Sequence, residues 1–270
     1  MTATVTITKG YADTQEGQLH YRTCPSGDPS AAPILFFHRA PVCSGSFDQV
    51  LKRLSGWRRM VAFDTPGFGQ SYTPDAGTPI SRVVDAFVQA VEGLGINRFH
   101  LVAHHSGSHF ASELALRLPG RALSLMLDGA MVASAEERAK VTPAATLPTI
   151  DPQGGYIEAA WKFLLPYYTV FDERCIHNEF VGAMASTFTR AATMDMVRAH
   201  DLGGVIAGLD CPILASAAVD DVFVAHLDRI AALASQSIIR RYGAAGIASP
   251  ALQTEVFCDL VRESVGRAEG

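Results

Sequence analysis

The chain lacks the features that define several large classes of protein. It has no basic run, and its formal net charge of −5 argues against nucleic acid as a partner. No stretch approaches the roughly 18 apolar residues of a membrane span, and the first residues do not have the pattern of a signal peptide. The five cysteines are scattered without a CxxC pair, which is typical of free thiols in a reducing compartment. We therefore expect a cytoplasmic protein that does not associate with membranes and acts on a small molecule.

The distribution of apolar residues predicts one large α/β unit. Hydrophobic residues make up 48% of 270, enough for a substantial core. An antiparallel pair is expected first, at Thr4–Thr8 and Gln18–Thr23, before short apolar runs typical of buried parallel strands. These runs are Pro33–Phe37, Arg59–Phe63, Phe99–Ala103, Ala122–Leu127, Pro212–Ser216 and Ser237–Tyr242. Helical spacing is found at Ser81–Leu94, Ser106–Leu118, Leu227–Leu233 and Pro250–Val265.

Residues 131–210 break this alternation. They contain no convincing strand, and their helical candidates are Tyr156–Leu164 and Asp172–Arg190. A structureless loop of this length would be improbable in a compact domain. We therefore predict a helical cap at 131–210 over a core formed by 1–130 and 211–270.

Four motifs in order resemble those of the α/β-hydrolase superfamily. They are Phe36–Pro41 (an oxyanion turn), Asp64–Ser71 (a glycine-rich loop), Leu101–Ala111 (a nucleophile elbow) and Pro212–Asp221 (a strand with an acid loop). The resemblance implies an α/β-hydrolase fold: a mostly parallel eight-stranded sheet flanked by helices, with the cap inserted between strands six and seven. Fold does not define function, so the site requires its own argument.

The elbow carries histidine where the family has its nucleophile. With His105 at the apex, the small residues Ala103 and Gly107 occupy the two crowded positions, and His104 falls where the family often has histidine. The other register, with Ser106 at the apex, would place larger side chains there. We therefore favour His105.

The family's general base is missing. Its histidine follows the eighth strand, but that loop here reads from Gly243 to Ser249 without histidine, and the last histidine of the chain is His226. An ordinary Ser–His–Asp relay therefore cannot be assembled.

The oxyanion turn also departs from the family, because Arg39 replaces its glycine. The amides of Ala40 and Ser106 could still face a developing oxyanion, and His38 is expected to brace backbone. The Arg39 guanidinium either grips a carboxylate or enolate in the pocket or points to solvent.

Two acids could orient His105. Asp221 matches the family's acid position, whereas Asp128 ends the strand beside the elbow strand, where some haloalkane dehalogenases carry their acid. A carboxylate on one ring nitrogen fixes the tautomer of the imidazole. We expect Asp128 to be the closer acid; its structural alternative is a turn residue before Gly129.

The sequence predicts neither a metal nor a cofactor. His105 and His109 have the spacing of a helical metal pair, but no convincing third ligand accompanies them. The residues that could line a pocket under the cap, or simply pack within it, are Trp161, Phe163, Tyr167, Tyr168 and Phe188.

Histidine at the apex allows two chemical roles. It could attack a carbonyl as a nucleophile, or act as a general acid–base group that requires no missing residue. We favour the second: cofactor-independent hydrolysis, carbon–carbon cleavage, or a lyase or cyclase step on a small carbonyl compound. The alternatives are a non-catalytic binding protein and an esterase that uses Ser106. The sequence leaves open whether the chain forms a homodimer.

Overall fold

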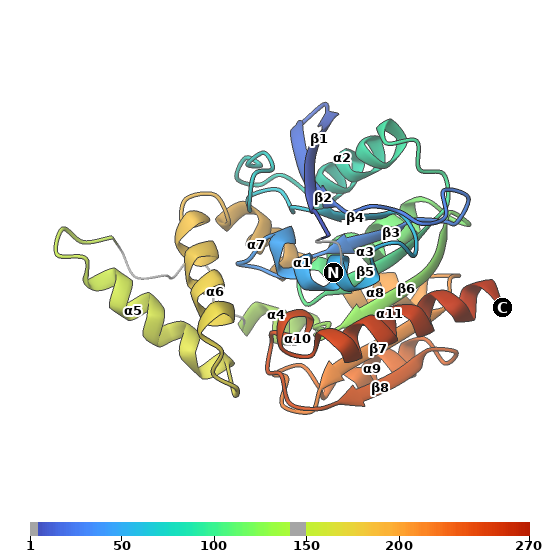
Figure 1. Ribbon diagram of the computed structural model, residues 1–270. Coiled ribbons are helices and arrows are strands. Elements are labelled where there is room, and N and C mark those ends of the chain that lie inside the picture. The colour runs from blue at the N-terminus through green and yellow to red at the C-terminus, as the bar shows by residue number, and fades with distance from the viewer. Residues whose placement is uncertain (1–4, 141–149) are drawn as a thin grey trace.

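The computed structural model of the chain describes residues 5–140 and 150–270 (Figure 1). A single eight-stranded sheet forms its centre. The strands are β1 (Thr8–Thr14), β2 (Gly17–Thr23), β3 (Ile34–Phe37), β4 (Met60–Phe63), β5 (Phe99–His104), β6 (Ala122–Asp128), β7 (Ile213–Ala218) and β8 (Ile238–Tyr242).

The sheet is mostly parallel, as the alternation of strands and helices predicts. Its order is β1-β2-β4-β3-β5-β6-β7-β8, and only β1 with β2 and β2 with β4 pair antiparallel. Strands β3 to β6 are almost entirely buried because helices cover both faces. The carboxyl ends of β5, β6 and β7 consequently meet at one edge, where their following loops converge.

Helices and two short 3₁₀ turns connect the strands. They are η1 (Ser44–Phe47), α1 (Asp48–Leu54), α2 (Ile80–Gly93), α3 (Gly107–Arg117), α4 (Ala135–Lys140), α5 (Gly155–Leu164), η2 (Leu165–Tyr167), α6 (Glu173–Ala185), α7 (Ala191–Ala199), α8 (Leu202–Ala207), α9 (His226–Leu233), α10 (Ser249–Leu252) and α11 (Thr254–Glu269). Within the described ranges, none combines the length and apolar character that a membrane crossing needs.

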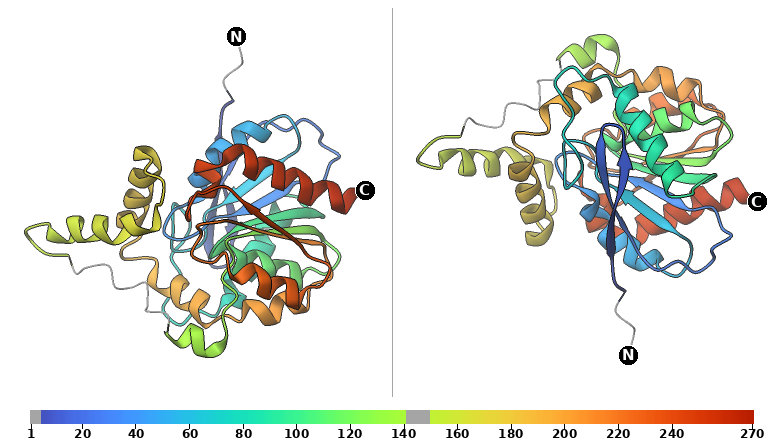
Figure 2. Two further views of the ribbon diagram at one scale, coloured as in Figure 1. Left: turned by 90° about the horizontal axis from the view of Figure 1, so that it is seen from below. Right: turned by 90° about the horizontal axis from the view of Figure 1, so that it is seen from above.

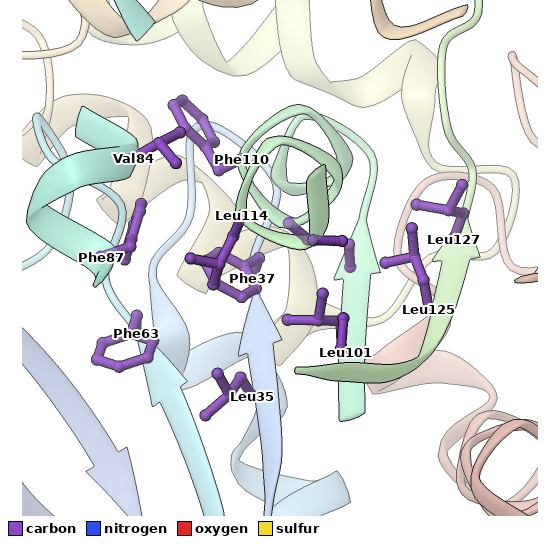
Figure 3. Packing of buried hydrophobic residues seen from close by; sticks show 14 of the residues in the cluster. Leu35, Phe37, Phe63, Val84, Phe87, Leu101, Phe110, Leu114, Leu125 and Leu127 are labelled. Atoms are coloured by element: carbon purple, nitrogen blue, oxygen red, sulfur yellow. The ribbon is translucent and has the colours of Figure 1, made fainter. Parts of the chain in front are cut away.

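Apolar side chains fill both faces of the sheet. On one face, Phe87 of α2 and Phe110 and Leu114 of α3 pack against Phe37 and Leu101 (Figure 3). On the other face, α1 and α11 cover a second buried cluster. Burial of this area supplies the main favourable free energy of folding and holds the strand ends in place.

The segment between β6 and β7 contains only helices among its described residues. α5 and α6 project away from the sheet as an angled pair, whereas α7 and α8 lie against the core (Figures 1 and 2). Met196 of α7 and Leu202 of α8 belong to the main buried cluster. Residues 141–149 of the predicted cap are outside the described residues.

Several predicted boundaries differ from the structure. The first strand begins at Thr8 and runs to Thr14, so the strand predicted at Thr4–Thr8 was placed too early in the chain. Thr4 itself lies outside the described residues. The helix predicted over Pro250–Val265 is two helices, because Gln253 has a non-helical backbone. The one predicted over Asp172–Arg190 ends at Ala185, before a turn that leads into α7.

Candidate active site

His105 stands at the apex of a strained turn between β5 and α3. Its φ is 47°, the one positive value of a non-glycine residue in the described chain. Its backbone N–H donates to the carbonyl of Asp128 at 2.8 Å, which ties the turn to β6. A Cβ at Gly107 would overlap the carbonyl oxygen of Phe37, so the position two residues after the apex tolerates glycine alone. Sterics therefore place His105, and not Ser106, at the apex.

Asp221 orients the imidazole of His105. Nε2 of His105 lies 2.7 Å from Oδ2 of Asp221, and both side chains are buried. The other carboxylate oxygen accepts the backbone N–H of Phe223 at 2.7 Å. Since an ionised carboxylate only accepts hydrogen bonds, Nε2 carries the proton and Nδ1 keeps the lone pair. No described residue hydrogen-bonds to Nδ1, so its lone pair is not engaged within the described chain.

The expectation that Asp128 would be the closer acid was wrong. Its carboxylate accepts hydroxyl hydrogen bonds from Ser216 at 2.7 Å, Tyr242 at 2.7 Å and Ser249 at 2.5 Å. Burial raises the pKa of Asp128 although these hydroxyls oppose the shift. His104 lies beyond hydrogen-bond reach of this carboxylate, with Nε2 at 3.6 Å. Asp128 therefore joins three segments of the sheet edge and does not orient His105.

Gly129 makes room for the pair of His105 and Asp221. Its φ is +61°, and a Cβ built there would overlap Nε2 and Cδ2 of His105 and approach Oδ2 of Asp221 at 2.9 Å. The Asp128-Gly129 corner thus turns the chain and also leaves space for the imidazole of His105. Sequence reasoning assigned Gly129 no role beyond this turn.

The loop after β8 is shaped without a histidine. Oδ1 of Asp220 accepts the amides of Ala245 at 2.9 Å and Gly246 at 3.0 Å, and Ser249 closes the loop onto Asp128. Ile247 is buried beside them. Asp220 and Asp221 therefore divide the work: the first holds this loop and the second holds His105.

The oxyanion turn after β3 is braced by His38. Nδ1 of His38 donates to the carbonyl of Arg39 at 2.8 Å, and Nε2 accepts the amide of Thr65 at 2.9 Å. Burial lowers the pKa of His38, so the imidazole stays neutral and can fill both roles. Beyond this brace, the amide of Ala40 donates to the hydroxyl oxygen of Ser106 at 2.8 Å. The amide that the family resemblance assigns to an oxyanion is thus engaged by a side chain.

The guanidinium of Arg39 does not point to solvent, and its N–H donors are already engaged by neighbouring side chains. Arg39 is 4% exposed, and its guanidinium binds both carboxylate oxygens of Glu179 on α6, one of them at 2.6 Å. It also donates to the hydroxyl of Tyr168 at 2.9 Å. Burial alone would lower the pKa of Arg39, but the charge of Glu179 raises it, so the pair stays ionised. This buried pair joins the oxyanion turn to the cap.

Glu179 was missed by sequence reasoning, although a signal exists. Ile176, Glu179 and Ala183 follow the spacing of one helical face, and all three are buried. A lone carboxylate on an apolar stripe indicates a buried cationic partner.

The predicted pocket residues have different fates. Tyr168 reaches the oxyanion turn through Arg39, and Trp161 packs against Phe180 with ring centroids 5.6 Å apart. Tyr167, Phe163 and Phe188 are 36%, 52% and 84% exposed and thus form outer surface. Phe163 lies on α5, which projects outward (Figure 1), whereas Tyr167 ends the 3₁₀ turn η2 and Phe188 lies in the turn after α6.

The histidine pair at positions 105 and 109 diverges. Nδ1 of His109 lies 2.9 Å from Nδ1 of His200, whose Nε2 contacts Oε1 of Glu113 at 2.7 Å. The two histidines of the helical spacing thus face different partners. The described residues hold no cluster of three or more histidine, cysteine or acidic side chains able to bind a metal ion.

Comparison with known proteins gives the class of the chain. The family profile described as "alpha/beta hydrolase fold" matches residues 32–156. A hydrolase structure from Pseudomonas aeruginosa PA01 superposes with a TM-score of 0.79 at 21% identity, over 98% of this chain and 100% of that one. The enol-lactonase from Burkholderia xenovorans LB400 gives 0.76 at 20% identity, over 95% and 100%. The fold is therefore the α/β-hydrolase fold.

Sequence comparison also finds proteins that are similar to this chain. A protein of Variovorax paradoxus named as a carbamate hydrolase, RutD, is 30% identical over 178 residues, which are 63% of this chain and 66% of the relative. The chain is therefore similar in sequence to proteins named as hydrolases, and it has the α/β-hydrolase fold. The first three curated relatives are matched over 25%, 66% and 30% of their own lengths.

Proposed function

We propose that the protein is a cofactor-independent enzyme that acts on a small carbonyl compound, with His105 as its acid–base group and Asp221 as the residue that orients it. The carrying observation is the 2.7 Å contact between His105 Nε2 and Asp221, because it leaves Nδ1 with a lone pair at the elbow apex. This role needs no histidine in the loop after β8. Similarity to proteins named as hydrolases supports hydrolysis as the reaction class.

The hydrolytic step balances with His105 alone. Nδ1 removes a proton from water while the water oxygen attacks the carbonyl carbon, and the carbonyl electrons move to its oxygen. When that tetrahedral species collapses, the proton on Nδ1 passes to the leaving group. The proton on Nε2 stays on that nitrogen and donates to the Asp221 carboxylate throughout, which keeps the imidazolium paired with a negative charge. The same base could instead remove a proton next to a carbonyl, the first step of carbon–carbon cleavage, elimination or cyclisation.

The test is His105→Asn, because asparagine tolerates a positive φ and keeps the turn intact. Activity would be assayed on p-nitrophenyl esters, lactones, carbamates and the deuterium exchange of enolisable ketones. On any substrate that the unaltered enzyme turns over, we expect a loss of about 10²- to 10⁴-fold in kcat. The matched control is His177→Asn on the exposed side of α6, which should change nothing. An unchanged kcat in His105→Asn would refute the mechanism.

One observation favours a second candidate, a ligand-binding protein without turnover. The Ala40 amide is engaged by Ser106, so the oxyanion turn is closed by the chain's own hydroxyl. This candidate predicts that small carbonyl compounds bind without conversion, and that His105→Asn leaves their affinity unchanged. Binding measured by calorimetry on the same compounds separates the two.

A further inference from the structure

The hydroxyl of Ser106 is held with its proton free. Its oxygen accepts the amide of Ala40 at 2.8 Å, and a hydroxyl has one proton to donate besides its lone pairs. No acceptor for that proton lies among the described residues. Ser106 is also only partly buried, unlike His104 and His105 before it and Gly107 after it. Ser106 is therefore the most exposed of these four residues of the elbow.

The contact with Ala40 also changes what this hydroxyl can do. A hydroxyl oxygen that accepts a hydrogen bond becomes a better donor through its own proton, because the two bonds polarise one another. The bond to Ala40 also restricts the rotation of the side chain, so the remaining directions of the proton are few. A preorganised donor of this kind stabilises charge that develops on a substrate oxygen.

The donor belongs to the residue next to the base in the chain. Ser106 directly follows His105, whose Nδ1 has no described partner. The backbone N–H of Ser106 likewise lacks an acceptor among the described residues. Two donors thus belong to the residue that follows the base in the chain, whereas the Ala40 amide is already engaged by the hydroxyl.

We infer that Ser106 is a catalytic residue of the proposed reaction: its hydroxyl, polarised by the Ala40 amide, donates a hydrogen bond to the substrate oxygen that becomes negative. The ligand class is a neutral carbonyl compound whose oxygen turns into an oxyanion or enolate. No proton is transferred from Ser106, and the Ala40 N–H stays on its oxygen. This inference rests on the proposed acid–base role of His105.

Ser106→Ala distinguishes this role from one in which the hydroxyl only blocks the Ala40 amide. If the hydroxyl only occupies the turn, its removal frees the Ala40 amide for the substrate, and kcat stays the same or rises. If the hydroxyl is the donor, kcat falls about 10²-fold with little change in KM. Ser106→Thr retains a hydroxyl and should recover most of the activity. A kcat at or above the unaltered value in Ser106→Ala would overturn the inference.

A binding measurement keeps the test independent of turnover. The probe is p-nitrophenol, whose ionised form absorbs visible light and carries its charge on one oxygen. Titrated in the His105→Asn background, where acid–base turnover is removed, the bound probe should ionise at lower pH than in the double variant with Ser106→Ala. Equal titration of the probe in both proteins would contradict the assignment even if the alanine variant folded poorly in assays.

The outcomes separate the two proposals. If His105→Asn keeps full activity, the proposed function fails whatever Ser106→Ala does. If His105→Asn loses activity while Ser106→Ala does not, only the role of Ser106 fails. Phenylmethylsulfonyl fluoride gives a third readout: a covalent adduct on Ser106, found by mass spectrometry, would make it a nucleophile and overturn its role as a hydrogen-bond donor.

Discussion

The elbow at His105 and the loop at residues 243–249 are built by similar devices but carry different chemistry. Both have a positive φ, 47° at His105 and 51° at Gly246, and both are tied down by an aspartate of the loop after β7. The elbow presents an imidazole with a free nitrogen, whereas the loop presents the buried Ile247. Both loops are thus held in the same way, but only the elbow carries a side chain that can exchange a proton.

The largest difference is expected between the two neighbouring aspartates. Asp221→Asn removes the charge that pairs with His105 and lets the amide donate to Nε2, which moves the ring proton to Nδ1 and blocks the base. We expect kcat to fall about 10³- to 10⁴-fold. Asp220→Asn is the matched control: it should lower the melting temperature, because the Ala245 and Gly246 amides lose a charged acceptor, and change kcat far less. Equal losses of kcat in both variants would remove the distinction between the loops.

Gly129→Ala tests the space behind the elbow. Its Cβ would displace His105 from Asp221, so we expect at least about a tenfold loss of kcat together with lower stability. The control is Gly77→Ala, since Gly77 also has φ +81° but nothing within 4 Å of the added Cβ. That variant should cost only the backbone strain of about 1–2 kcal/mol in free energy of unfolding and retain kcat. Full activity in Gly129→Ala would show that the elbow tolerates movement.

The buried His109 on the helix after the elbow should make the free energy of unfolding depend on pH. Burial and the neighbouring His200 lower the pKa of His109 to about 3. Between that pH and the ordinary value near 6.5, the unfolded chain binds a proton that the folded chain does not, so stability falls as pH falls. Burial shifts His104 in the same direction. Urea unfolding from pH 6.5 to 4.5 should therefore show a falling free energy of unfolding.

His109→Asn, which keeps a donor near the Nδ1 position, should flatten this slope by about 1.4 kcal/mol per pH unit. A slope identical to that of the unaltered protein would mean that His109 is protonated in the folded state. His177→Asn again serves as the exposed control and should leave the slope unchanged.

The smallest effect is expected where the loop closes on Asp128. Ser249→Ala removes one of three hydroxyl donors to this buried carboxylate, at a cost of about 1–3 kcal/mol in free energy of unfolding. Activity should change little, because Asp128 does not touch the imidazole of His105. Ser235→Ala on the surface is the control. A loss of kcat as large as that of Asp221→Asn would restore Asp128 to the site.

Local patterns in the sequence already predict much of this site. The small residues Ala103 and Gly107 identify His105 as the apex, because the steric demand of the turn is carried by adjacent residues. The missing histidine between Gly243 and Ser249 is visible for the same reason. The parallel sheet follows from short apolar runs that alternate with helical periodicity.

Contacts between distant residues could not be predicted in this way. The choice of Asp221 over Asp128 depends on loop geometry 116 residues from His105, and Arg39 finds Glu179 across 140 residues. Cap residue Phe163 was misplaced because helical spacing gives a face but not the direction in which that face points, and Phe188 lies in a turn beyond the end of α6.

The sequence by itself determined the fold class, the strained turn with its histidine and the absence of a base after β8, since each depends on residue types within a few positions of one another. Three features were decided by the tertiary structure alone. Asp221 is the carboxylate that orients His105, Arg39 pairs with Glu179 of the cap, and the Ala40 amide donates to the Ser106 hydroxyl. These depend on side-chain directions and close approaches of only a few ångströms between separate elements, and packing settles such distances only when the whole chain has folded.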